Sequence, residues 1–199
     1  MPGFGRQTSL SRGILRVIVI FMIVAMYFLA KYTATHRSAK ALYYTVWCAA
    51  ITDHPEELRV ALEQGGDPNA RNPANEPALM VAAHNGNLTC CRLLLEHHAN
   101  PNIRGSSDAT PLEHAITTRQ TAIISLLLKF HADPNQADVY GETPLMDAAA
   151  KGDPRSTRLL LDDGADPNLV SKTGVTALQI ARKYRATDVE AILLQHSAR

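Results

Sequence analysis

Residues 133–165 read DPNQADVYGETPLMDAAAKGDPRSTRLLLDDGA, and at residue 166 the same pattern begins again with DPN. Counting outward from this stretch, Asp/Asn-Pro-Asn recurs every 33 residues without an insertion, at 67–69, 100–102, 133–135 and 166–168. An alanine and a leucine-rich triplet keep the same interval. The alanine recurs at Ala49, Ala82, Ala115, Ala148 and Ala181, and the triplet at 60–62, 93–95, 126–128, 159–161 and 192–194. A fixed period of this length predicts a stack of about five similar units, each burying its apolar face against its neighbours.

Each unit is predicted to hold two short helices. The pair Thr143–Pro144, like the Thr-Pro pair one repeat earlier, is typical of a helix start with Thr as N-cap and Pro at the first helical position. The leucine-rich triplet that follows has the spacing of a second, more buried helix. Before the first helix, Gly141 and Gly174 stand where other units have Asn75 and Asp108. All of these residue types tolerate a left-handed backbone, so we expect a turn there.

The chain resembles ankyrin-repeat proteins, most closely in GETPL at 141–145 and LLLDDGAD at 159–166, and the resemblance covers about residues 43–199. It implies an all-α solenoid of about five 33-residue helix-turn-helix units with β-turn fingers, of an exported or membrane-anchored bacterial type. The chain departs from the family pattern after the Thr-Pro-Leu turn, where the usual His is replaced by Met80, Glu113, Met146 and Gln179. His98 and His131 also replace a glycine that usually ends the second helix.

Residues 14–31 are predicted to be a transmembrane helix that acts as an uncleaved signal anchor, because Val17 to Ala30 form an uncharged apolar run. At about 1.5 Å per residue this segment is slightly shorter than the ~30 Å hydrocarbon core. Arg16 and Lys31 must therefore extend toward the two membrane surfaces, as long cationic side chains do. A cleaved signal peptide and a buried core helix are the alternative interpretations.

This interpretation divides the chain into a cytoplasmic tail (1–13), the anchor (14–31), a linker (32–42) and the repeat domain (43–199). Cationic residues flank the anchor on both sides, so the charge rule does not decide its orientation. We favour a cytoplasmic tail, which places the repeats in the periplasm or an equivalent extracytoplasmic space. The predicted location is the inner membrane, crossed once.

Composition excludes several classes of function for the repeat domain. Residues 1–40 hold six of the 20 Lys and Arg and no acidic residue, so 14 cationic residues against 19 Asp and Glu leave the rest at −5. That charge argues against a nucleic-acid partner, which requires a basic surface. No glycine-rich phosphate loop, nucleophile motif or zinc-protease motif occurs, so we expect no catalytic residues, no cofactor and no small-molecule substrate.

Histidines and cysteines support a weaker alternative. His97, His98 and His131 lie in adjacent loops and suggest a metal- or ligand-dependent sensor, but no cysteine or carboxylate cluster completes a metal site, so we expect no metal. By their positions in the repeat, Cys48, Cys90 and Cys91 are expected to be small core residues, with a disulfide from Cys48 to Cys90 or Cys91 left open in an oxidising compartment. Asn87-Leu88-Thr89 matches a glycosylation sequon.

The surface that stacking leaves free is the predicted binding site. We call it the concave strip: the finger tips and the exposed side of the first helices, through which proteins that this chain resembles bind other proteins. Carried over by position, its candidate partner-binding residues are Arg71, Glu76, His84, Asn85, Arg104, Ser106, Ser107, Thr117, Thr118, Val139, Tyr140, Glu142, Lys151, Lys172, Lys183 and Tyr184, with Pro73, Ala74, Ala109 and Thr173 beside them. Tyr140 and Tyr184 are the preferred anchors, since Tyr is enriched among residues that dominate interface energy.

The expected function is a membrane-tethered, non-catalytic module that binds a protein partner. An inhibitor or immunity protein that masks an effector enzyme is the favoured role, suggested by the resemblance to exported bacterial ankyrin proteins. A scaffold or accessory protein for an envelope or oxidative-stress enzyme is the alternative within the same class. The histidine-dependent sensor is the alternative from another class.

Overall fold

The computed structural model describes residues 42–43, 45–105 and 108–197, and the chain divides into two units, Met1–Ala41 and Leu42–Arg199. Of the helices in the described ranges, none combines the length and the apolarity needed to cross a membrane. The predicted anchor at 14–31 lies outside the described residues, as does the predicted tail. The fold below is therefore that of the second unit.

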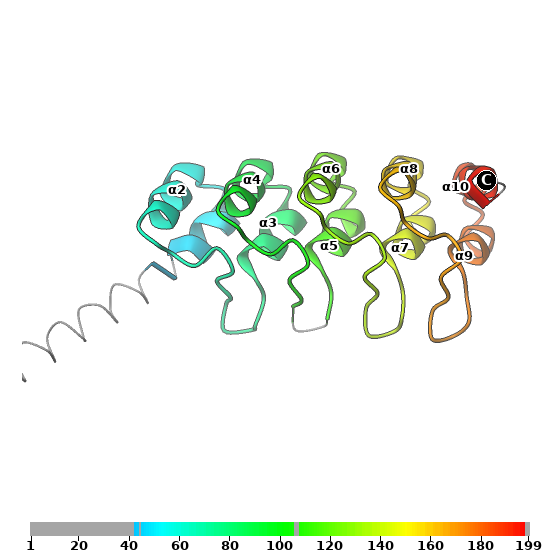
Figure 1. The fold of residues 1–199 in the computed structure, drawn as a ribbon, viewed down its shortest axis with the longest axis horizontal. Helices are drawn as coiled ribbons and strands as arrows, with labels where there is room; N and C mark the ends of the chain where they lie inside the picture. Colours follow the sequence, from blue (N-terminus) through cyan, green and yellow to red (C-terminus); the bar gives the residue numbers. More distant parts are fainter. Residues whose placement is uncertain (1–41, 44, 106–107, 198–199) are drawn as a thin grey trace, which may run out of the picture. The chain divides into compact units, whose positions relative to one another are not determined.

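The second unit is a stack of helix pairs. Residues 45–52 are helical, and the labelled helices that follow are α2 (Pro55–Glu63), α3 (Ala78–Asn85), α4 (Leu88–Glu96), α5 (Pro111–Thr117), α6 (Thr121–Lys129), α7 (Pro144–Ala150), α8 (Pro154–Asp162), α9 (Ala177–Lys183) and α10 (Thr187–Ser197). Helices α3, α5, α7 and α9 lie side by side in one layer, and α2, α4, α6, α8 and α10 form the other (Figure 1). Extended fingers connect consecutive pairs and project to one side (Figure 1). No strand forms among the described residues, which confirms the all-helical repeat prediction there.

Thr and Pro begin α5 and α7 as the sequence predicts. Thr110 precedes Pro111 of α5, accepts a hydrogen bond from Glu113 N at 3.2 Å, and donates its own backbone N–H to the Glu113 side chain at 3.1 Å. Thr143 caps α7 through a 3.4 Å hydrogen bond from Met146 N. These caps satisfy backbone N–H groups that have no partner within the helix.

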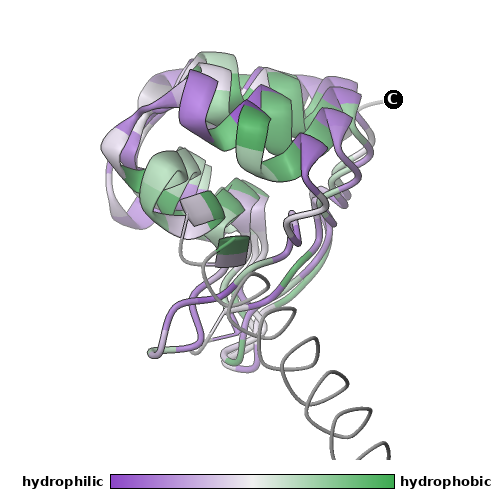
Figure 2. Ribbon diagram, turned by 90° about the vertical axis from the view of Figure 1, so that its left-hand side faces the viewer, coloured by the Kyte–Doolittle hydropathy of each residue, from purple (hydrophilic) through white to green (hydrophobic). Residues whose placement is uncertain are grey.

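The core lies between the two helix layers, where Figure 2 shows the hydrophobic residues concentrated. The middle leucines of the triplets, Leu94, Leu127 and Leu160, are fully buried. The predicted core is less complete at the two ends, because Val60 and Leu194 remain about half exposed. Both belong to the outermost units that the structure describes, so no described repeat covers the position that is covered in the inner units.

The repeated asparagine of each finger joins neighbouring units. Asn69 Oδ1 accepts a hydrogen bond from Asn100 N at 2.8 Å, and the same contact recurs in the next two units. The three pairs are Asn69–Asn100, Asn102–Asp133 and Asn135–Asp166. An Asn side chain is required because its carbonyl reaches the backbone one repeat later, which explains why the Pro-Asn pair returns at 33-residue intervals.

The turn residues adopt the expected backbone. Asn75 and Gly141 have φ values of 65° and 74°, and His98 and His131, at the ends of α4 and α6, have φ values of 68° and 64°. A left-handed backbone is uncommon for histidine. These two residues therefore accept the conformation that a glycine would adopt more easily, as the sequence predicts.

One cysteine prediction is wrong. Cys90 and Cys91 are fully buried in α4, but Cys48 is exposed, and all three thiols are free. Cys48 holds the same repeat position as Val81, His114 and Asp147, which are half-buried, and Val81 and His114 line a hollow at the surface. Asn87, the asparagine of the predicted glycosylation sequon, is buried. Its side-chain amide donates hydrogen bonds to the carbonyls of Ala50 and Ile51 in the preceding unit.

Candidate protein-binding surface

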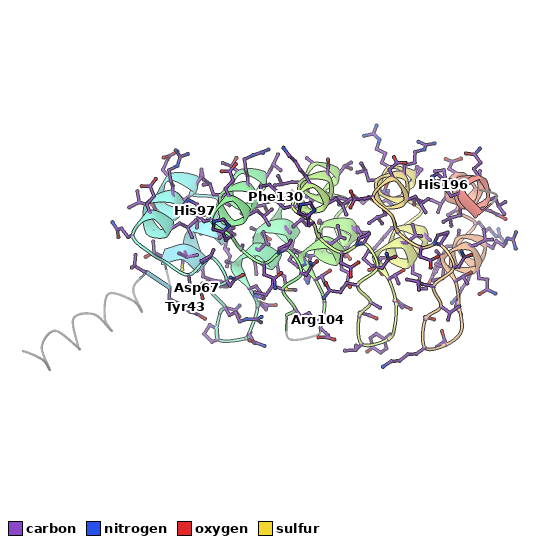
Figure 3. All side chains as sticks on the ribbon, in the orientation of Figure 1. Tyr43, Asp67, His97, Arg104, Phe130 and His196 are labelled. Atoms are coloured by element: carbon purple, nitrogen blue, oxygen red, sulfur yellow. The ribbon has the colours of Figure 1, made fainter. Side chains whose placement is uncertain are left out.

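Two arginines of the concave strip hold neighbouring fingers together. Arg71 donates from Nη1 to the Arg104 carbonyl at 2.8 Å, and Arg104 repeats the contact to the Ala137 carbonyl at 3.1 Å. Arg104, which Figure 3 labels, also forms a 2.7 Å ion pair with Asp108 at the turn of its own finger. These guanidinium groups are partly buried, and the contacts that they make hold neighbouring fingers in place.

The two tyrosines predicted as anchors are free of the core. The side chains of Tyr140, on the finger before α7, and Tyr184, at the end of α9, are 69% and 58% exposed. Val139, beside Tyr140, is also exposed. The ammonium of Lys183 lies 5.5 Å from the centre of the Tyr184 ring, in range of a cation–π interaction.

The remaining predicted residues divide by exposure. Exposed on the surface are His84, Asn85, Thr117, Glu142, Lys151, Lys172 and Lys183. Glu76 and Thr118 are half-buried, and Ser106 and Ser107 lie outside the described residues. The exposed members come from several consecutive units, and their part in binding stays a prediction.

Two carboxylic acids of the first helices, Glu113 and Asp147, have strongly raised pKa values. The sequence analysis did not select either of them as a candidate binding residue. Burial is the main cause that raises the pKa of Glu113 to about 7, and the negative charges of Asp147 and Asp138 add to it. The hydrogen bond from the Thr110 backbone and the positive charge of Arg104 act in the opposite direction. Burial is also the main cause that raises the pKa of Asp147 to about 7, and the charges of Glu142 and Asp138 add to it. The positive charge of Lys151 acts in the opposite direction. The only sequence indication was that Glu113 replaces the family's usual His.

A histidine pair lies on the neighbouring helices. The Nδ1 atoms of His84 on α3 and His114 on α5 are 3.4 Å apart, and the rings meet edge to face. Burial, and then the charge of His84, lowers the pKa of His114. Together with Glu76, Met80 and Val81 these rings line a shallow hollow of about 200 Å³ in the concave strip.

The family model for ankyrin repeats in three copies matches residues 46–138 and again 123–199. The chain belongs to the ankyrin-repeat family. No curated protein matches it. Ankyrin repeats indicate a module for protein–protein interaction, and the described surface has the exposed aromatic and charged side chains that such a module needs.

For this ankyrin-repeat chain the histidine-dependent sensor gains no support from geometry. His97, at the end of α4 (Figure 3), and His98 belong to one unit and His131 to the next. Within the described ranges, no three His, Cys, Asp or Glu side chains are placed so that they could hold a metal ion.

Proposed function

We propose that this ankyrin-repeat chain is a non-catalytic, membrane-tethered protein that captures a protein partner through its concave strip. The observation that carries the proposal is the exposure of Tyr140 and Tyr184. Stacking of the units does not need these side chains, whereas an interface gains most from large, rigid aromatic groups. The chain acts by covering a surface of its partner in a fixed stoichiometry, and it catalyses no reaction.

We further propose that the partner is an effector enzyme in the periplasm, and that the chain acts as its inhibitor or immunity protein. The apolar run at 17–30 with cationic residues on both sides supports the membrane anchor. The formal charge of −5 on residues 41–199 supports a protein partner over a nucleic acid. Protease accessibility of a C-terminal tag tests this orientation. A tag that protease reaches from outside the inner membrane would agree with it. A tag that is protected in intact cells and also in spheroplasts would contradict it.

Capture itself is tested with the double variant Tyr140→Ala/Tyr184→Ala. Because both side chains lie outside the core, we expect unchanged thermal unfolding and at least a tenfold loss in recovery of the partner after affinity purification. Arg92→Ala and Arg158→Ala, at exposed positions of the other helix layer, are the matched controls and should leave recovery unchanged. Equal recovery with the tyrosine variant and the controls would refute the proposed surface.

A further inference from the structure

Two histidine rings from neighbouring units share one hollow of the concave strip. His84 lies on α3 and His114 on α5, helices that pack side by side. Their Nδ1 atoms are 3.4 Å apart, and the rings meet edge to face, with 5.5 Å between their centres and 72° between their planes. The two residues are 30 positions apart in the sequence, so stacking of the units brings them together. We call His84 and His114 the histidine pair.

The distance between the two nitrogens suits a shared metal ion. Hydrogen bonds donated by an N–H group are usually about 2.7–3.2 Å long, so a direct hydrogen bond explains the 3.4 Å distance poorly. Two nitrogens that bind one ion at about 2.0–2.1 Å, with tetrahedral or trigonal angles, are about 3.3–3.6 Å apart. The histidine pair therefore has the spacing of two ligands of one ion without a movement of either helix.

Two further donor groups line the same hollow, which has a volume of about 200 Å³. One is the carboxylate of Glu76, whose Oε2 accepts a 2.8 Å hydrogen bond from Asn72. Among the described residues no three His, Cys, Asp or Glu side chains are placed to hold an ion, so Glu76 does not complete the histidine pair. The other donor is the thioether of Met80, which precedes His84 by one helical turn on the same face of α3.

Gly105 on the following finger makes space for this thioether. Other units have Asn72, Asp138 and Ser171 at the same repeat position, and each of these side chains accepts a backbone hydrogen bond within its own finger. Gly105 cannot make that hydrogen bond, and a Cβ atom at this position would lie only 2.8 Å from Met80 Sδ. The sulfur therefore lies between the same two units that the histidine pair joins.

We propose that the histidine pair and Met80 form a binding site for copper(I). A thioether is a soft ligand that selects copper(I), and imidazole also binds copper well. Zinc is a poorer occupant, because its protein ligands are Cys, His and carboxylates and Glu76 is not placed to add one. The site goes beyond the proposed capture of a protein and does not depend on it.

The state of the rings agrees with this assignment. A metal binds the unprotonated imidazole nitrogen. Burial, followed by the charge of His84, lowers the pKa of His114, and the charge of Glu76 acts in the opposite direction. The ring of His114 is therefore largely neutral at pH 7. Because the ion would bind only when both units are folded and stacked, copper(I) should also raise the temperature of unfolding.

The test is an anaerobic titration of the full-length chain with copper(I) in competition with the chelator bathocuproine disulfonate. All proteins carry Cys48→Ser, so that the exposed thiol does not bind copper. We expect the otherwise unmodified chain to remove one equivalent of copper(I) from the chelator, and His84→Asn/His114→Asn to bind it at least tenfold more weakly. His98→Asn/His131→Asn, at two exposed histidines of the helix ends, is the matched control and should bind as the unmodified chain does.

A second pair of variants tests the thioether. Met80→Leu should weaken copper(I) binding at least tenfold, whereas Met146→Leu, at the same repeat position two units later, should leave it unchanged. Unfolding without metal is measured for each protein, so that misfolding is not read as lost binding. Copper(I) binding that the variant of the histidine pair leaves unchanged would overturn the site. Zinc(II) binding as tight as that of copper(I), with Met80→Leu without effect on either ion, would overturn its assignment to copper(I).

Discussion

Replacing Glu113 with Gln should stabilise the fold, and the gain should grow with pH. Glu113 is almost fully buried, and its pKa rises from 4.5 to about 7. The folded state therefore holds this proton in a range where the unfolded chain has released it, so stability falls as pH rises from about 4.5 to about 7. At about 1.4 kcal/mol per pH unit, ionising Glu113 costs the folded state about 3 kcal/mol by pH 8, and about 1 kcal/mol at pH 5.

Glutamine keeps the acceptor for the Thr110 N–H and never ionises, so Glu113→Gln should remove about 2 kcal/mol of the stability loss between pH 5 and pH 8. Urea unfolding of the full-length chain, followed by far-ultraviolet circular dichroism at both pH values, measures this difference. Some pH dependence should remain, because Asp147 also has a raised pKa. The exposed residue Glu96 supplies the control Glu96→Gln, which should follow the unmodified chain. A pH dependence that is the same with Glu and Gln at 113 would refute the reasoning.

Three further predictions concern the core, the fingers and the thiols. Leu127→Ala, at a fully buried position, should lower the free energy of unfolding by about 2–5 kcal/mol in urea titrations, and a loss below 1 kcal/mol would mean that the helix layers are loosely packed. Arg104→Ala removes the contacts to Asp108 and Ala137 and should cost about 1–2 kcal/mol while increasing amide hydrogen exchange in both fingers; unchanged exchange would contradict its role. The exposed thiol of Cys48 should react with Ellman's reagent in the folded protein, whereas Cys90 and Cys91, whose pKa values burial raises to about 12, should react only after unfolding, and three equally fast thiols would be inconsistent with the fold.

The repeat could be predicted from sequence because each residue that recurs every 33 positions has one structural role. The Thr143–Pro144 pair caps a helix, and the Leu127 position fills the space between the two layers in every inner unit. Positions that face the concave strip have no such constraint. The position shared by Cys48 and Asp147 varies from unit to unit, so alignment with core positions gave the wrong exposure for Cys48.

The raised pKa of Glu113 escaped sequence analysis for a related reason. Glu113 and Asp138 are 25 positions apart in the sequence, and their charges meet only because consecutive units stack in register. The double use of Arg104 could not be predicted either. Its contact to the Ala137 carbonyl depends on how far one finger lies from the next, which is a property of the stacked units and not of either one alone.

The central claim is that the concave strip, and no other face, contacts a protein partner. The most direct measurement places a photocrosslinking amino acid at Tyr140, Tyr184, Arg92 or Arg158 of the full-length chain in living cells. We predict one discrete crosslinked product, of the same partner, from positions 140 and 184 and none from positions 92 and 158. Crosslinks of equal yield from all four positions, or from 92 and 158 alone, would contradict it.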